Sequence, residues 1–85
     1  MFSYNSYYGL YLWDNYWRSY RINSEAAIQI ALQSVPGQVV KVELDFNNGV
    51  LLYEVDIRTA TGVYEVHVHA ITGQILKVEK DFDYD

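Results

Sequence analysis

Residues 51–58 read Leu-Leu-Tyr-Glu-Val-Asp-Ile-Arg, and this stretch decides the fold. Apolar and charged side chains alternate along it, which is the period-two pattern of a β-strand with one buried side and one solvent-facing side. We expect the core side to carry Tyr53, Val55 and Ile57. The solvent side is expected to carry Leu52, Glu54, Asp56 and Arg58.

Three neighbouring segments show the same alternation and predict three further strands. In the segment before it, the expected inward residues are Val40, Val42, Leu44 and Phe46, and they alternate with Val39, Lys41, Glu43 and Asp45. In the segment after it, Tyr64, Val66, Val68 and Ala70 are expected inward, and Glu65, His67 and His69 outward. A shorter fourth strand is expected over residues 74–79. Asn- and Gly-containing turns separate the strands, because these residues tolerate positive φ angles.

Residues 23–35, upstream of the strands, predict one helix. Asn23 or Ser24 can cap its free N–H groups, and Glu25 lies in the first turn, where the helix dipole favours a negative charge. Pro36 and Gly37 end the helix. Its apolar face is formed by Ala27, Ile28, Ala31, Leu32 and Val35. A helix followed by an antiparallel meander predicts an α+β fold, with one helix packed on a sheet of three or four strands.

The first 22 residues differ in composition from the rest and hold most of the aromatic side chains of the chain. Leu10, Trp13, Trp17 and Tyr20 recur at helical spacing, which predicts an additional helix over about residues 8–20. Aromatic residues also favour strands, and Gly9 weakens a helix. We therefore divide the chain into an aromatic-rich N-terminal segment (1–22), a domain (23–80) and an acidic tail (81–85).

Length and charge exclude several classes of protein. The 85 residues suffice for one domain, and six Lys and Arg against 11 Asp and Glu give a net charge of -5. Such an acidic surface repels phosphate backbones, so we expect no nucleic-acid partner. No cysteine is present to form a disulfide or a thiol nucleophile. No segment is apolar enough for membrane insertion, and none reads as a signal peptide, so an exported form would have this chain as its mature part.

Short motifs in the order seen here resemble the PepSY family. They are Ser24-Glu25-Ala26-Ala27 through Ala31-Leu32 to Val35-Pro36-Gly37, then Tyr53-Glu54-Val55, Gly62-Val63-Tyr64-Glu65-Val66-His67-Val68, and Ala70-Ile71-Thr72-Gly73-Gln74-Ile75-Leu76. The family takes its name from the propeptides of thermolysin-type metallopeptidases and from a spore germination protein. The resemblance implies a helix on a small antiparallel sheet, a bacterial protein that is secreted or held in the cell envelope, and a non-catalytic module that binds or inhibits peptidases.

The chain departs from the family pattern at two places. His69 stands where the family often has Asp, and residues 1–22 match nothing in the pattern. No peptidase domain follows the PepSY-like region, so we expect any inhibition to act in trans on a separate protein.

His67 and His69 are the only two histidines, and their i, i+2 spacing places both on the polar side of one strand. With Glu54 or Asp56 they are weak candidates for a zinc or copper site. We favour their being exposed partners of acids on the next strand, because two histidines without a third firm ligand rarely form a site. The sequence therefore predicts no metal and no other cofactor.

The carboxylates also raise the question of catalysis. Glu54 and Glu65 can oppose each other across strands as a general acid and base, but an open sheet face seldom supplies the enclosed pocket that catalysis needs. The sequence holds no nucleophile motif. We expect no enzymatic activity.

The aromatic segment is the feature that the fold explains least. Partner-binding residues are expected to be Trp13, Tyr16, Trp17 and Tyr20, since such side chains are common interface anchors. Alternatively the segment packs on the core or on a second copy, because exposed apolar patches are uncommon. The first hypothesis is an extracytoplasmic PepSY module that binds a protein partner, a peptidase modulated in trans. The alternative is a structural envelope protein that self-assembles as a homodimer through this segment.

Overall fold

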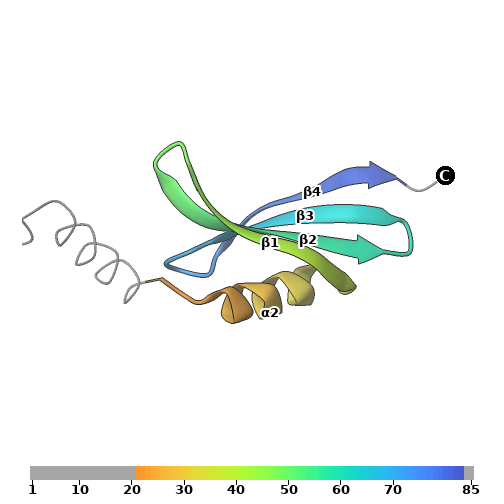
Figure 1. The fold of residues 1–85 in the computed structure, drawn as a ribbon, viewed down its shortest axis with the longest axis horizontal. Helices are drawn as coiled ribbons and strands as arrows, with labels where there is room; N and C mark the ends of the chain where they lie inside the picture. The colour runs from red at the N-terminus through yellow and green to blue at the C-terminus, as the bar shows by residue number, and fades with distance from the viewer. Residues whose placement is uncertain (1–20, 84–85) are drawn as a thin grey trace, which may run out of the picture.

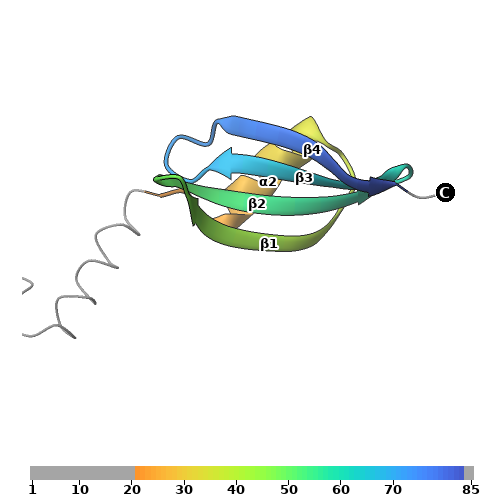
Figure 2. The same cartoon turned by 90° about the horizontal axis from the view of Figure 1, so that it is seen from above.

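The computed structural model describes residues 21–83, and these have the expected α+β architecture (Figure 1). The helix α2 (Ser24–Ser34) precedes four strands, which are β1 (Gln38–Asn47), β2 (Val50–Thr59), β3 (Gly62–His69) and β4 (Ile75–Asp83). The strands form one antiparallel sheet in the order β1-β2-β3-β4. Figure 2 shows α2 crossing one face of this sheet. The predicted fold class is confirmed, and the helix expected over residues 8–20 lies outside the described residues.

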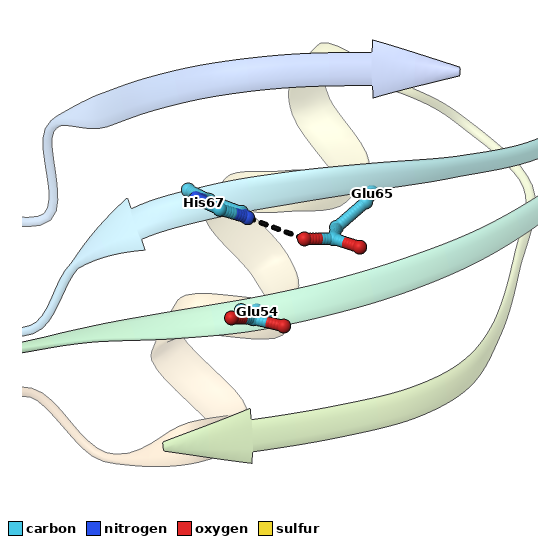
Figure 3. A group of neighbouring side chains, drawn as sticks. All are labelled: Glu54, Glu65 and His67. Carbon is cyan, nitrogen blue, oxygen red and sulfur yellow. Dashed lines mark hydrogen bonds and ion pairs between the residues drawn. The ribbon is translucent and has the colours of Figure 1, made fainter. Parts of the chain in front are cut away.

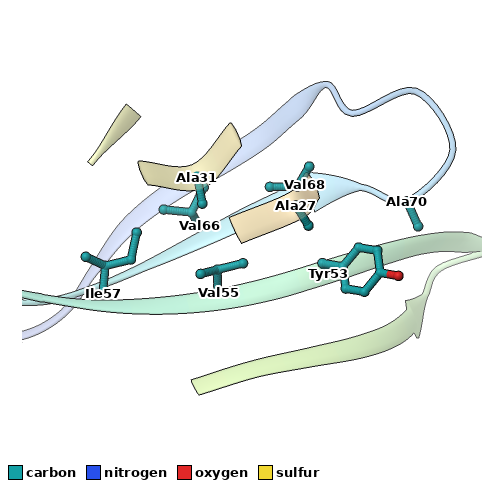
Figure 4. Close-up of a cluster of buried hydrophobic side chains, with 8 residues drawn as sticks. All are labelled: Ala27, Ala31, Tyr53, Val55, Ile57, Val66, Val68 and Ala70. Carbon is teal, nitrogen blue, oxygen red and sulfur yellow. The ribbon is translucent and has the colours of Figure 1, made fainter. Parts of the chain in front are cut away.

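The core lies between α2 and the sheet face that it crosses (Figure 4). Its buried side chains are Ala27, Ala31, Tyr53, Val55, Ile57, Val66, Val68 and Ala70. Only small alanines of α2 are fully buried, so the helix backbone approaches the sheet closely. Each buried Val or Ile contributes about 1.5–3 kcal/mol relative to an exposed one.

The start of α2 is fixed to the sheet by hydrogen bonds. The Asn23 side chain accepts a bond from the Ala26 N–H at 2.8 Å, which confirms the expected cap. The Ile22 N–H donates to the Ala70 carbonyl at 2.7 Å, and the Ile22 carbonyl accepts from the Tyr53 hydroxyl at 2.7 Å. Ile22 also packs against the core. Ile22 is therefore held in a fixed position beside the sheet.

Bulges in the edge strands change the predicted alternation. We expected Val40 to face the core, but it is unpaired between Val39 and Lys41 and is 43% exposed. An extra residue in a strand reverses the alternation across it, so Val39, just before the bulge, pairs with Ile57 on the helix side, whereas Val42 after it pairs with Val55 as expected. The last strand was predicted to end at residue 79. It instead continues to Asp83, with irregular pairing at residues 76 and 81.

The side chains on the sheet face away from α2 are less exposed to solvent than the sequence predicted. Leu52, Val63 and His67 all project from this face, yet they are only 4%, 7% and 9% exposed. Figure 1 shows the twisted sheet with the tip of the β1–β2 hairpin bent away from α2. Cross-strand neighbours cover these side chains, since Leu52 pairs with His69, His67 with Glu54 and Val63 with Arg58. Leu44 and Phe46, on the helix side of β1, remain 41% and 68% exposed.

Candidate functional site

Three ionisable side chains meet at the middle of the sheet face away from α2 (Figure 3). Glu54 projects from β2 directly opposite His67 on β3, and Glu65 lies two residues before His67 on the same strand and face. One potential ligand atom from each residue lies within 4.8 Å of the other two. His67 Nε2 is 2.5 Å from Glu65 Oε2, and the two side chains are 11% and 23% exposed. We call these three residues the Glu-Glu-His cluster.

Two carboxylates of this face, those of Glu54 and Asp56, hold their protons more tightly than free carboxylates do. Burial raises the pKa of Glu54 above its ordinary value of 4.5, and a hydrogen bond with Asp45 and the charge of Glu65 raise it further, against an opposing effect of His67. Burial also raises the pKa of Asp56, and the neighbouring charges of Glu65 and Asp81 add to the effect. Negative charge is therefore concentrated around Glu65.

The lysines of this face pair with acids on their own strands. Lys41 Nζ lies 3.5 Å from Glu43 on β1, and Lys77 Nζ lies 2.9 Å from Glu79 on β4. Lys77 stands opposite His67, and its pKa is raised by the hydrogen bond and charge of Glu79 and more weakly by Glu65 and Glu54. Basic groups thus flank the Glu-Glu-His cluster on the two edge strands, while its centre holds two carboxylates and one imidazole.

The second histidine has a different role. His69 Nδ1 accepts hydrogen bonds from the backbone N–H groups of Ile71 and Thr72, at 3.1 and 3.3 Å, and so caps the turn between β3 and β4. An Asp carboxylate at this position can accept the same bonds, which accounts for a histidine where the PepSY pattern often has Asp. The sequence pattern groups the two histidines. The structure instead brings His67 together with Glu54 and Glu65, and the i, i+2 spacing of Glu65 and His67 was the signal that could have found this pair.

A cavity of about 480 Å³ opens on the other side of the sheet, where α2 begins. Its lining comes from the chain before α2, from β1 and from β2, namely Arg21, Ile22, Asn23, Ser24, Val42, Glu43, Leu44 and Tyr53. Glu54 and Glu65 project from the opposite face, so the two carboxylates that could oppose each other as acid and base do not line this cavity.

Four residues expected to bind a partner, Trp13, Tyr16, Trp17 and Tyr20, lie outside the described residues, and their role stays a prediction. Among residues 21–83, no helix combines the length and the apolar character needed to cross a membrane.

Comparison with known proteins agrees with this architecture. The model of the PepSY family, described as the peptidase propeptide and YPEB domain, matches residues 21–79. The chain belongs to the PepSY family. PepSY domains are in general extracytoplasmic, non-catalytic modules associated with peptidase propeptides or with peptidase inhibition.

One solved structure shares both fold and sequence with this PepSY chain. It is a candidate lipoprotein from Clostridium difficile 630, 31% identical over 73% of this chain, with a TM-score of 0.71. The chain spans 41% of the length of that protein. Among curated proteins, no relative was found.

Proposed function

We propose that this chain is a non-catalytic extracytoplasmic PepSY module that binds an extended segment of a protein partner along the outer edge of β1, with which no strand among residues 21–83 pairs. The partner is a peptidase, which the module inhibits or modulates in trans. The observation that carries the proposal is the difference between the two edge strands of the sheet.

The two edges differ in how well a further strand can pair with them. On β1, the pairing with β2 is regular from Lys41 to Asn47, so its outer edge presents a continuous run of backbone groups. On β4, the register shifts at Leu76 and at Asp81. Bulges twist an edge and interrupt the ladder that a new strand would need. β4, with two bulges, is therefore the more protected edge, and β1, whose one bulge at Val40 lies near its start, is the more open one.

The open edge also carries apolar anchors. Leu44 and Phe46, on the helix side of β1, are 41% and 68% exposed. Leu44 lines the cavity beside the start of α2, together with Ile22. A peptide added as a strand gains affinity from main-chain hydrogen bonds and specificity from pockets that receive alternate side chains. The edge of β1, with its adjacent cavity, supplies both.

The aromatic segment is proposed to extend this surface. Trp13, Tyr16, Trp17 and Tyr20 precede Arg21 in the sequence, and Arg21 lines the cavity beside β1. Tyr and Trp offer large contact areas at low entropic cost, which suits residues that anchor a partner.

An inhibition assay with a secreted thermolysin-type metallopeptidase tests the proposal. We expect the full chain to inhibit it, and the double substitution Leu44→Ser with Phe46→Ser to weaken inhibition at least about tenfold, the loss expected for two interface anchors. Val78→Ser is the matched control, because Val78 is 45% exposed but lies on the protected edge. Absence of inhibition by the unaltered chain, or an equal loss with Val78→Ser, contradicts the proposal.

A homodimer is the second candidate, favoured by the same open edge, since two copies of β1 can pair with each other as readily as with a foreign strand. Sedimentation of the full chain measures this directly. A dimer that dissociates on Trp13→Ser with Trp17→Ser, or on Phe46→Ser, would favour a self-assembling envelope protein. A monomer at all concentrations would exclude it.

A further inference from the structure

We propose that the Glu-Glu-His cluster of Glu54, Glu65 and His67 is a binding site for a divalent first-row transition metal ion, with Zn²⁺ as the reference ion. This site lies on the sheet face away from α2, and it is separate from the β1 edge proposed to bind a partner. The cluster supplies three ligand atoms of the types that zinc takes, which are one imidazole nitrogen and two carboxylate oxygens.

The geometry of the cluster is close to that of a three-ligand site. Its ligand atoms lie within 4.8 Å of one another. Zinc bound to nitrogen and oxygen at about 2.0–2.1 Å places its ligands about 3.4 Å apart, so a modest rotation of the side chains closes the site. Glu54 is half-buried and can make this rotation, while His67 is held in place by burial. A bound ion would lie between His67 Nε2 and Glu65 Oε2, where the hydrogen bond now runs.

Burial of the imidazole distinguishes the cluster from an ordinary group of surface acids. His67 is 9% exposed, and its Nε2 is directed at a carboxylate. Lys41 and Lys77, the lysines of this face, are engaged by Glu43 and Glu79. A divalent ion would balance the two carboxylate charges of Glu54 and Glu65. The imidazole ligand favours zinc and its first-row neighbours over Mg²⁺ and Ca²⁺, which prefer oxygen.

The ligand set is open on one side. Three protein ligands leave a fourth position for water or for a ligand atom of another molecule, and the Glu65 side chain of the cluster is 23% exposed. Lys77 stands opposite His67, and beside its ion pair with Glu79 its charge also interacts with Glu65 and Glu54. Replacing Lys77 with Ala is therefore expected to tighten metal binding.

Titration calorimetry and thermal unfolding of the untagged full chain with ZnCl₂ test the proposal. We expect one equivalent of Zn²⁺ to bind, and saturating Zn²⁺ to raise the Tm by at least about 4 °C, whereas Mg²⁺ does not. His67→Gln and Glu54→Gln should each weaken binding at least about tenfold. Because Glu54→Gln removes one of two neighbouring negative charges, that variant is expected to remain folded without metal.

Two matched controls separate ligation from general attraction of cations. Glu43→Gln removes the same charge from the same sheet face, opposite Glu54 but outside the cluster. His69→Gln removes the other histidine. Both variants are expected to bind Zn²⁺ within about threefold of the unaltered chain, since neither supplies a ligand. No saturable Zn²⁺ binding, an equal loss with Glu43→Gln, or a Tm shift that Mg²⁺ reproduces would each overturn the proposal.

Discussion

Replacing Gly37 with Ala is expected to destabilise the domain by a steric clash with the backbone of the neighbouring strand. Gly37 lies between α2 and β1, next to Gln38, which pairs with Arg58. A Cβ atom at this position would collide with the Arg58 carbonyl oxygen and lie 2.7 Å from Ile57 Cγ2. Neither neighbour can move freely, because one is a backbone atom of a central strand and the other belongs to a fully buried side chain.

Two opposing contributions set the size of the effect. Overpacking against atoms that cannot relax costs about 1–3 kcal/mol. Ala restricts the unfolded chain more than Gly does, and this stabilises the folded state by about 0.4–1 kcal/mol. The free energy of unfolding should therefore fall by about 1–2 kcal/mol, and for a domain of this size the Tm should fall by about 4–16 °C.

Urea unfolding followed by circular dichroism measures this change, with an unchanged m-value required for a two-state comparison. Gly49→Ala is the matched control, since no atom lies within 4 Å of the position that its added methyl group would occupy, and its φ of +79° adds only the cost of a left-handed residue. That cost is about 1 kcal/mol before the same gain from the unfolded chain. Gly37→Ala variants as stable as the unaltered protein, or more stable than Gly49→Ala, would refute the argument.

Three further predictions concern polar groups. Tyr53→Phe removes the hydrogen bond to the Ile22 carbonyl and should lower the unfolding free energy by about 1 kcal/mol in urea. His69→Asp should retain the turn and leave the Tm nearly unchanged, whereas His69→Leu leaves two backbone N–H groups without their acceptor and should lower stability by about 1–2 kcal/mol. The raised pKa values of Glu54 and Asp56 mean that the folded state binds protons more tightly than the unfolded state. The free energy of unfolding should therefore fall as the pH rises above about 4.5. Urea unfolding at a series of pH values should show a shallower fall for Glu54→Gln than for the unaltered chain.

The residues on the helix side of the sheet could be predicted from the sequence because the two-residue alternation of a strand determines them. Alternation in the central strand places Val55 and Ile57 in the core, as expected. The Asn48-Gly49 turn, with φ angles of 54° and 79°, also follows from residue type. Val40 could not be placed, since both of its neighbours Val39 and Lys41 fit a strand and nothing in the local pattern shows which residue a bulge leaves unpaired.

The site was harder to predict because it depends on contacts between strands. Alternation puts Glu65 and His67 on one face, but only the register shows that Glu54 stands opposite His67. The burial of His67 depends on its neighbours Glu54 on β2 and Lys77 on β4, which only the register supplies. Spacing alone groups His69 with His67, although the Nδ1 of His69 is committed to the turn. The aromatic residues 13–20 lie outside the described residues, so the partner-binding prediction there stays a prediction.

The two histidines differ in whether the fold accounts for them. His69 accepts two backbone hydrogen bonds that the turn requires, so its presence follows from the fold. His67, Glu54 and Glu65 cover a face that no helix packs against within residues 21–83, where β-branched or uncharged polar side chains would form the strands with less repulsion. A carboxylate with a raised pKa beside a buried imidazole lowers the stability of the fold. Groups that lower stability in this way are concentrated at functional sites. A Glu54→Gln variant that gains stability while losing its response to zinc would show that Glu54 both destabilises the fold and binds the metal ion.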